Sequence, residues 1–329
     1  MNHHAPQLHL SPDSWYQTGE LRFYDPETRT LSEKSSSGRH RVFRRRTGSA
    51  TRWTSEPVTV FLGGFPDGSF GWSRVEPRLK DPERPRLYID YLGMGASDTP
   101  RHYRYSSMER ADQIEAHLLD LGIRDLHIVS FDFSSLVVME ILSRQADRQA
   151  RGEPQGPRIR SISVFNGGLF TDGHSHPWFT TPVLNSPFGG MGTWFAQRSR
   201  FVFAQMVNVL WSKDYGVTSQ EVSELFSVVT RNRGAHFMSA GAGFVREHLR
   251  QKTRWDFKRL FVSTQHDIRW CLVASKKDPF ERKQVRKAEK RLRTYAPDAR
   301  WLPGGHLTTS EHPDLMARII HDITDPADS

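Results

Sequence analysis

The chain has 329 residues, of which 36% are hydrophobic and 25% charged, and its formal net charge is +9. This length and composition predict a globular protein with one large core. We expect neither a membrane-spanning helix nor a secretion signal, because the sequence shows no apolar run of that length and no basic segment followed by an apolar one. The single cysteine, Cys271, excludes an intramolecular disulfide and a cysteine metal cluster. We therefore expect a cytoplasmic protein without a metal or other cofactor.

Much of the positive charge lies in two runs, residues 39–46 (RHRVFRRR) and residues 281–293 (ERKQVRKAEKRLR). Clustered lysine and arginine can attract nucleic acid or an anionic membrane. The spacing of the second run also suits a solvated helix face, and neither run comes with a nucleic-acid-binding motif. We therefore expect no nucleic-acid partner, while peripheral contact with a membrane through the lid and this basic surface stays open.

In chain order, the pattern predicts a disordered lead-in over residues 1–13 and then an antiparallel hairpin from residues 20–24 and 40–43. Short apolar or β-branched runs then alternate with amphipathic helices, which is typical of a mostly parallel sheet with helices on both faces. The strands are expected at 57–62, 85–91, 126–130, 159–165, 270–275 and about 300–302. The helices are expected at about 107–121, 134–150 and 313–323, with a basic helix within 281–293.

The strand pattern stops between residues 167 and 256, where aromatic and helical segments such as 194–211 and 219–231 take over. This change predicts a helical lid inserted into the core, with some of its aromatic side chains lining an apolar pocket. The predicted division is a core over 14–166 and 257–329 with a cap over 167–256.

Asp132 lies where a buried strand meets a helix, in the segment SFDFSS (130–135). Small residues, Ser130 and Ser134, occupy both positions two removed from it, which is the spacing of a nucleophile elbow. They must be small because the central residue of an elbow sits on a strained strand-to-helix turn. The alternative is that Asp132 caps the following helix, since aspartate is a favoured N-cap residue.

Further matches favour the elbow. The segment GGFP (63–66) follows a predicted strand, where an α/β-hydrolase presents a backbone N–H for its oxyanion hole, and Phe65 and Phe133 would be the donors. Asp278 follows the strand at 270–275, and His306 follows the last strand. Nucleophile, acid and histidine thus occur in the chain order that α/β-hydrolases use.

On these motifs, the sequence resembles the α/β-hydrolase branch that contains epoxide hydrolases, haloalkane dehalogenases and the mesoderm-specific transcript proteins. The resemblance spans about residues 15–323, and the segments 166–168 and 212–225 look closest to the mesoderm-specific transcript group. The segments that carry it are GGFPDGSFGW (63–72), DYLGMGASDTP (90–100), SFDFSSLVVMEIL (130–142), VFNGGLF (164–170) and the tail with Asp278 and His306.

The resemblance implies a two-step reaction. Asp132 would attack an electrophilic carbon and form an alkyl ester, which a water activated by His306 would then hydrolyse. Asp278 would orient the imidazole, and the backbone N–H groups of Phe65 and Phe133 would stabilise charge on the carbonyl oxygen of Asp132. The expected substrate is an apolar small molecule bound under the lid, and an epoxide fits this chemistry.

The resemblance also implies that Tyr215, Pro66 and Asn166 contact the substrate. Dehalogenases of this branch bind the halide with a tryptophan after the nucleophile and an asparagine in the first loop, but this chain has Phe133 and Phe65 there. Dehalogenation is therefore not expected. Epoxide hydrolases use two lid tyrosines, whereas Tyr215 is the only tyrosine between residues 106 and 294.

Two other functions stay open at this point. One is a catalytically weak or inactive scaffold that keeps the fold and binds a lipid or protein partner. The other is a lipid ester hydrolase, although acyl chemistry normally uses a serine at the elbow and the chain contains no G-x-S-x-G motif.

Overall fold

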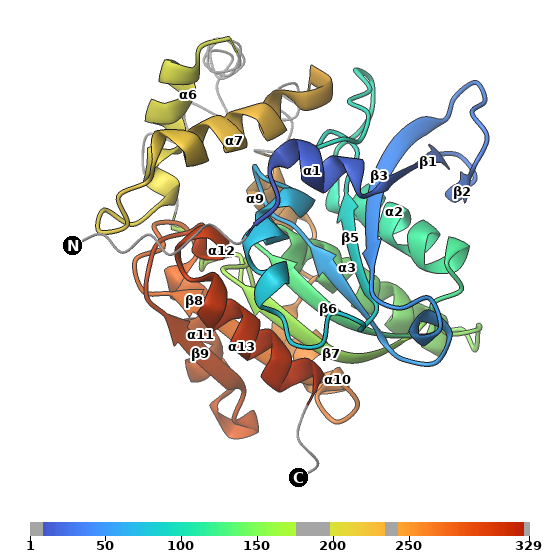
Figure 1. The fold of residues 1–329 in the computed structure, drawn as a ribbon. Helices are drawn as coiled ribbons and strands as arrows, with labels where there is room; N and C mark the ends of the chain where they lie inside the picture. Colours follow the sequence, from blue (N-terminus) through green and yellow to red (C-terminus); the bar gives the residue numbers. More distant parts are fainter. Residues whose placement is uncertain (1–8, 176–197, 234–242, 326–329) are drawn as a thin grey trace.

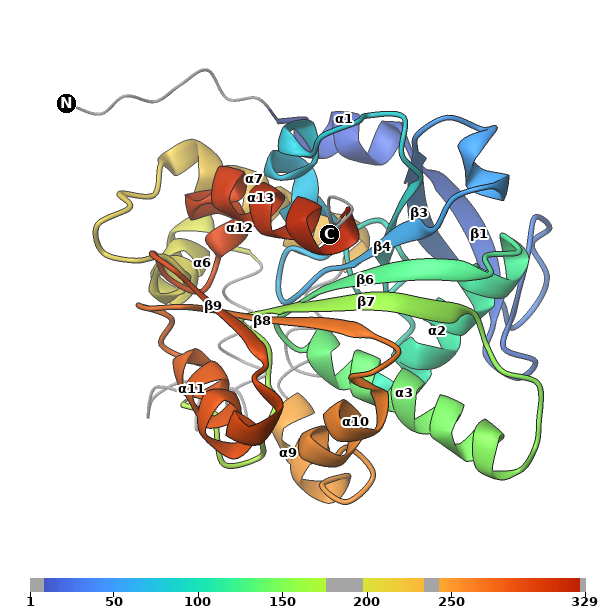
Figure 2. The same cartoon turned by 90° about the horizontal axis from the view of Figure 1, so that it is seen from below.

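The protein is described by a computed structural model that covers residues 9–175, 198–233 and 243–325. One twisted sheet has helices packed against both of its faces (Figures 1 and 2). The strand order is β2-β1-β3-β5-β4-β6-β7-β8-β9. The first three strands pair antiparallel, as does β3 with β5, and the remaining neighbours pair in parallel. The predicted mostly parallel sheet with helices on both faces is confirmed.

The strands lie close to their predicted positions. They are β1 (Glu20–Asp25), β2 (Thr30–Ser32), β3 (His40–Thr47), β4 (Val58–Leu62), β5 (Arg86–Asp90), β6 (Asp125–Phe131), β7 (Arg158–Phe165), β8 (Arg269–Ser275) and β9 (Asp298–Leu302). The short strand β2 was not predicted; it pairs with β1 inside the hairpin connection.

The helices also follow the prediction in the core. They are α1 (Pro12–Gln17), α2 (Ser107–Asp120), α3 (Ser134–Ala150), α6 (Arg200–Val207), α7 (Ser219–Thr230), α9 (Phe244–Arg250), α10 (Phe257–Thr264), α11 (Arg282–Arg291), α12 (Thr308–Glu311) and α13 (Pro313–Thr324). Short 3-10 turns add η2 (Ser69–Arg74) and η4 (Asn208–Leu210). The part of the expected helix 194–211 that precedes residue 198 lies outside the described residues.

The N-terminal end differs from the predicted lead-in over residues 1–13, because α1 already begins at Pro12. The side chain of Ser11 caps its first turn. Trp15 is fully buried, and its indole Nε1 donates to Ser69 Oγ at 3.1 Å. One buried tryptophan thus anchors a helix too short to be predicted from periodicity.

The two faces of the sheet bury different helices. On β4, Val58, Val60 and Leu62 belong to the cluster that contains α2, α3 and α10. Phe61 belongs to the other cluster, with Trp15 and the apolar side of α13. Because neighbouring strand residues point to opposite faces, a strand covered on both sides is apolar throughout. This is why the central strands appeared as continuous apolar runs.

Between β7 and α10 the described chain forms the α-helices α6, α7 and α9, and residues 198–233 and 243–256 contain no strand. Figure 1 shows α6 and α7 beside each other at one end of the sheet, and the rings of Phe203 and Phe226 lie 5.3 Å apart between them. This agrees with an inserted helical segment, while the cap boundaries stay a prediction. Among the described helices, none has the length and apolar character needed to cross a membrane.

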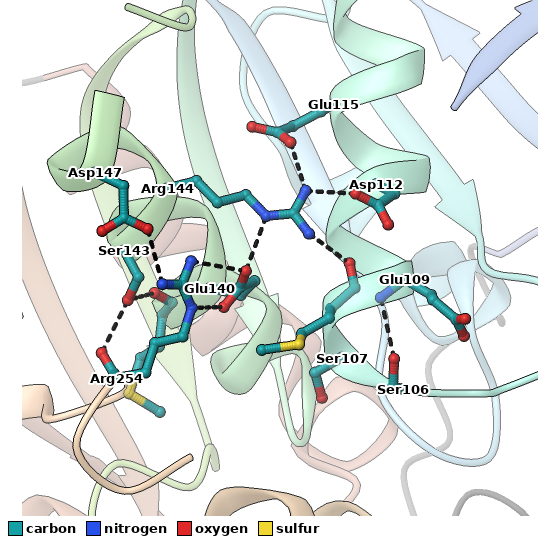
Figure 3. Close-up of polar contacts among 12 residues, drawn as sticks. Ser106, Ser107, Glu109, Asp112, Glu115, Glu140, Ser143, Arg144, Asp147 and Arg254 are labelled. Carbon is teal, nitrogen blue, oxygen red and sulfur yellow. Dashed lines mark hydrogen bonds and ion pairs between the residues drawn. The ribbon is translucent and has the colours of Figure 1, made fainter. Parts of the chain in front are cut away.

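A polar network joins α2, α3 and the segment before α10 (Figure 3). Arg144 on α3 donates to Asp112 (2.7 Å) and Glu115 (2.6 Å) on α2 and to Glu140 (2.9 Å) on its own helix. Glu140 is only 2% exposed and also accepts from Arg254 Nε at 2.7 Å. The network therefore ties α3, the helix that follows Asp132, to both neighbouring segments.

Candidate active site

Asp132 occupies the tight turn between β6 and α3. Its φ of 55° is positive, which is uncommon for a residue with a side chain and marks local strain. Its backbone N–H donates to Phe165 O (3.0 Å), so the turn is fixed against the end of β7. The N-cap of α3 is Phe133, without a side-chain cap hydrogen bond. Asp132 is thus placed as the centre of an elbow, and the helix-cap alternative does not describe it.

Ser134 and Ser135, which follow Asp132, form hydrogen bonds that stabilise the turn. Ser134 Oγ donates to Gly63 O (2.6 Å) and so joins the elbow to the loop after β4. Ser135 Oγ lies within hydrogen-bond distance of Asp132 O (2.9 Å) and Gly168 O (3.0 Å). Because their hydroxyl groups are used in this way, these serines brace the elbow.

The loop after β4 presents a backbone N–H to the Asp132 carboxylate. Phe65 N donates to Asp132 Oδ2 at 2.9 Å, and the N–H of Phe133 is a second backbone donor to this carboxylate. A Cβ on Gly64 would lie 2.6 Å from Asp132 Cβ and 2.5 Å from Phe131 Cδ1. Glycine is therefore required at residue 64, because only a bare backbone can approach the elbow this closely.

His306 lies between two buried carboxylates. Its Nδ1 is 3.0 Å from Asp278 Oδ2, and its Nε2 is 3.5 Å from Asp132 Oδ1. The exposed fractions are 3% for His306, 0% for Asp278 and 5% for Asp132. The rings of Phe131 and Phe280 flank the imidazole, with centroids 5.3 and 5.1 Å away. The structure thus brings the three predicted residues together in an apolar setting, and the described residues contain no metal-ligating cluster.

The charges of this cluster are coupled. Burial raises the pKa of Asp132, but the hydrogen bond and charge of His306 and the backbone N–H groups outweigh it and hold that pKa below its usual range. Burial lowers the pKa of His306, yet the charges of Asp278 and Asp132 raise it well above its ordinary value. Both shifts favour a resting site in which Asp132 is an ionised carboxylate beside a charged imidazole.

A comparison with protein families identifies the family of the fold. The family described as "Alpha/beta hydrolase family" matches residues 59–319. The chain belongs to the alpha/beta hydrolase family. This α/β-hydrolase is 27% identical over 206 residues to the mesoderm-specific transcript protein of Mus musculus, which covers 61% of this chain and 59% of that relative. It is 25% identical over 296 residues to the probable oxidoreductase EphD of Mycobacterium tuberculosis, covering 83% of this chain and 46% of that relative.

Solved structures show the same fold. The haloalkane dehalogenase DatA from Agrobacterium tumefaciens C58 is similar with a TM-score of 0.67 and 16% identity, covering 93% of this chain and 96% of that one. The haloalkane dehalogenase DbeA from Bradyrhizobium elkani has the same score and identity, covering 93% and 97%. The resemblance inferred from the sequence motifs is confirmed, and at this identity the structural likeness shows the fold alone.

In this α/β-hydrolase, the side-chain amide of Asn166, a predicted substrate contact, is engaged within the protein. It is 1% exposed, and its Nδ2 lies 2.8 Å from His306 O, 3.0 Å from Ser275 Oγ and 3.1 Å from Thr308 Oγ1. Its Oδ1 accepts from Ser275 N at 2.7 Å. The whole amide is used within the protein, so the structure assigns Asn166 to fixing the His306 loop against the ends of β7 and β8.

Replacing Asn166 with alanine is expected to lower the free energy of unfolding by about 2 kcal/mol, because it leaves buried backbone and hydroxyl groups without partners. Urea unfolding at neutral pH measures this loss. Asn208→Ala, which removes an exposed amide at the end of α6, serves as the control and is expected to leave stability unchanged. Equal stability of the two variants would contradict the role given to Asn166.

Tyr215 and Pro66 are the other predicted substrate contacts. The Tyr215 hydroxyl donates to Glu221 Oε1 at 2.6 Å and also lies 3.1 Å from Ser310 O. Pro66 is buried directly after Phe65. Across the described part of the chain, no hydrogen bond or ion pair joins either residue to Asp132 or His306, so their contact with substrate stays a prediction.

Glu311 supports the loop that contains His306, although no sequence pattern pointed to it. Glu311 accepts from Gly305 N (2.9 Å), next to His306, and from Ser212 N (2.8 Å), which follows η4 in the predicted lid. The carbonyl of Leu210 accepts from His306 N at 2.8 Å. No local pattern could have signalled the bonds from Ser212 to Glu311 and from His306 to Leu210, because each joins segments about a hundred residues apart. These two bonds connect the predicted lid directly to the loop that contains His306.

Proposed function

We propose that this α/β-hydrolase opens an electrophilic small molecule by forming a covalent ester at Asp132, and that the substrate is an epoxide on an apolar molecule. The observation that carries the proposal is that the two carboxylate oxygens of Asp132 have different neighbours. Oδ2 accepts the backbone N–H of Phe65, while Oδ1 faces His306. One oxygen is thus fixed and the other is directed toward the site.

In the first step, Asp132 Oδ1 attacks a carbon of the epoxide. The C–O bond of the ring breaks with its electron pair on the ring oxygen, and that oxygen takes up a proton. The ionised state of Asp132 supports this role, because a carboxylate needs no further deprotonation to act as a nucleophile. The ester has no negative charge, so its formation removes one of the charges that raise the pKa of His306.

In the second step, His306, once it has released the proton that it holds at rest, takes a proton from water, and the resulting hydroxide attacks Cγ of the ester. The negative charge then develops on Oδ2, which already accepts the N–H of Phe65, and the N–H of Phe133 is a second backbone donor to this carboxyl group. Asp278 orients the imidazole and stabilises its charged form. The alkoxide leaves with the proton from His306, and the product is a diol.

Two features favour an epoxide over other substrates of this chemistry. The side chains of Phe65 and Phe133 have no N–H group with which to bind a departing halide. A serine nucleophile for acyl transfer is disfavoured because Ser134 and Ser135 stabilise the turn and lie outside the His306 hydrogen bonds. An epoxide releases no separate leaving group, so it needs no leaving-group site.

The test is to trap the ester. His306→Gln should keep the first step and block the second, so incubation with styrene oxide or dodecyl epoxide should add the mass of the substrate to the peptide that contains Asp132. The wild type should instead release the diol. The measurement is peptide mass spectrometry combined with chromatography of the product.

Controls separate this proposal from its alternatives. Asp132→Ala in the His306→Gln background should abolish the label, whereas Asp125→Ala, at the other end of β6 and partly exposed, should retain it. Labelling that survives Asp132→Ala would refute the nucleophile. Absence of any label or diol would favour the non-catalytic scaffold, and turnover of p-nitrophenyl esters that survives Asp132→Ala would favour the lipid ester hydrolase.

A further inference from the structure

Asp67 is a buried carboxyl group that the triad does not use. It lies two residues after the oxyanion donor Phe65, is 4% exposed, and its Oδ1 has no hydrogen-bond partner within the described residues. No lysine, arginine or histidine of the described chain lies at ion-pair distance from it. Placing a carboxylate without a cation in a buried site is costly, so the neutral acid is favoured.

The position of Asp67 is beside the reaction centre. It lines a small cavity of about 30 Å³ together with Leu307, which follows His306, and with Trp211 from the predicted lid. The indole Nε1 of Trp211 is also buried without a hydrogen-bond partner in the described structure. The carboxyl group of Asp67 and the indole of Trp211, both with unpaired polar atoms, thus line a cavity large enough for one hydroxyl group or water molecule.

The charged and titratable groups around Asp67 agree with a proton-carrying role. Burial raises its pKa to about 7, its own backbone N–H and the charge of His306 oppose that rise, and Asp132 and Asp90 add to it. A group with this pKa holds its proton in part of the molecules near neutral pH and can both donate and recover it. The groups that face it are His306, Asp132, Asp90 and Tyr16, with Arg74, Glu221 and Glu224 on the cavity wall.

The proposed reaction needs such an acid. When the epoxide ring opens, the electron pair of the broken C–O bond stays on the oxygen, which must take a proton. Tyr215, the lid tyrosine, already donates its hydroxyl proton to Glu221. The expected acid of the related enzymes is therefore engaged elsewhere.

We propose that Asp67 is the general acid that protonates the epoxide oxygen as Asp132 attacks, an inference that rests on the proposed function. Asp67 becomes a carboxylate in this step. It then recovers a proton from His306 through a bridging water molecule, because the two side chains are not at ion-pair distance. The imidazolium can release this proton because it has lost one of its two carboxylate partners now that Asp132 is an ester. His306 is left neutral and able to activate water. After hydrolysis, the Asp132 carboxylic acid returns a proton to His306, so the resting state is restored.

The experiment compares Asp67→Asn with the wild type by rapid-quench mass spectrometry of Asp132 alkylation. Asparagine keeps the shape but cannot donate this proton. Alkylation by styrene oxide should slow by about 100-fold or more. Alkylation by hexyl methanesulfonate should be unchanged, because its leaving group needs no proton. Asp81→Asn, an exposed carboxyl in the loop between β4 and β5, is the control and should match the wild type with both reagents.

The outcomes distinguish the two proposals. Equal styrene oxide rates in Asp67→Asn and the wild type would refute the acid while leaving the ester mechanism standing. Equal slowing with both reagents would mean that Asp67 only supports the site, which also refutes the acid. No Asp132 adduct in the wild type or in His306→Gln would refute the proposed function, and the acid with it.

Unfolding provides a readout that does not depend on activity. Because the folded-state pKa of Asp67 is raised from its ordinary value to about 7, the folded state binds more protons than the unfolded state between about pH 4 and 7. The contribution of Asp67 to stability is thus greatest in acid and is lost as the pH rises through 7. Asp67→Asn should remove this part of the dependence of the unfolding free energy on pH. An unchanged dependence would show that Asp67 is ionised in the folded state and cannot serve as the acid.

Discussion

Replacing Asp278 with asparagine is expected to slow hydrolysis of the Asp132 ester by about 10⁴-fold. Asparagine keeps the size of the side chain but removes the charge that stabilises the imidazolium and selects the tautomer with a proton on Nδ1. Asp278 is also the strongest of the charges that raise the pKa of His306. Single-turnover decay of the trapped ester measures the first effect, and NMR titration of the imidazole measures the second.

The direction of the pH effect follows from the raised pKa of His306. The ion pairs of this histidine stabilise the fold fully below its unfolded pKa of about 6.5, and the stabilisation is lost as the pH rises through the higher folded-state pKa. Asp278→Asn should lower the folded-state pKa of His306, so that this stabilisation is lost at a lower pH. Asp172→Asn, which removes an exposed partner of Lys287 and Arg291, is the control. It should change neither the rate of ester hydrolysis nor the pKa of His306. An unaltered imidazole titration in Asp278→Asn would contradict the assigned role.

The grouping of Asp132, Phe65, Asp278 and His306 could be predicted because each follows a strand. In a parallel sheet the carboxyl ends of the strands meet at one edge, so residues that follow β4, β6, β8 and β9 converge there whatever their sequence separation. The elbow itself was predictable from local sterics, since only small neighbours fit beside a residue at φ 55°.

The direction of individual side chains could not be predicted in the same way. Asn166 also follows a strand, yet its amide turns to the backbone of His306 rather than to the pocket. Tyr215 was predicted as a substrate contact from its residue type, but its hydroxyl group donates to Glu221, and this partner depends on how α7 packs. Such orientations depend on groups distant in the sequence, which periodicity and spacing do not report.

Short elements were missed for a different physical reason. The strand β2 has three residues and α1 has six, so neither is long enough to show a period of two or 3.6 residues. Their formation depends on tertiary anchors instead. For α1 this anchor is Trp15, which is buried against η2.

Replacing Glu140 with alanine is expected to lower the free energy of unfolding strongly, because Glu140 is the central acceptor of the polar network on α3 (Figure 3). Glu140 accepts from Arg144 Nε (2.9 Å), Arg254 Nε (2.7 Å) and Trp255 Nε1 (2.7 Å). Alanine would leave the indole N–H and part of two guanidinium groups without a partner in a mostly buried site. Breaking such a pair from one side costs about 3–5 kcal/mol.

Glu140→Ala is expected to lower the free energy of unfolding by about 3 kcal/mol, the lower end of that range, because both arginines keep other carboxylate partners. Arg144 still pairs with Asp112 and Glu115, and Arg254 still pairs with Asp147. Urea unfolding measures the change, and Glu153→Ala, which breaks an exposed pair, should leave the unfolding free energy unaltered. Equal stability of the two variants would show that α3, and with it the elbow at its N-terminal end, is fixed by apolar packing alone.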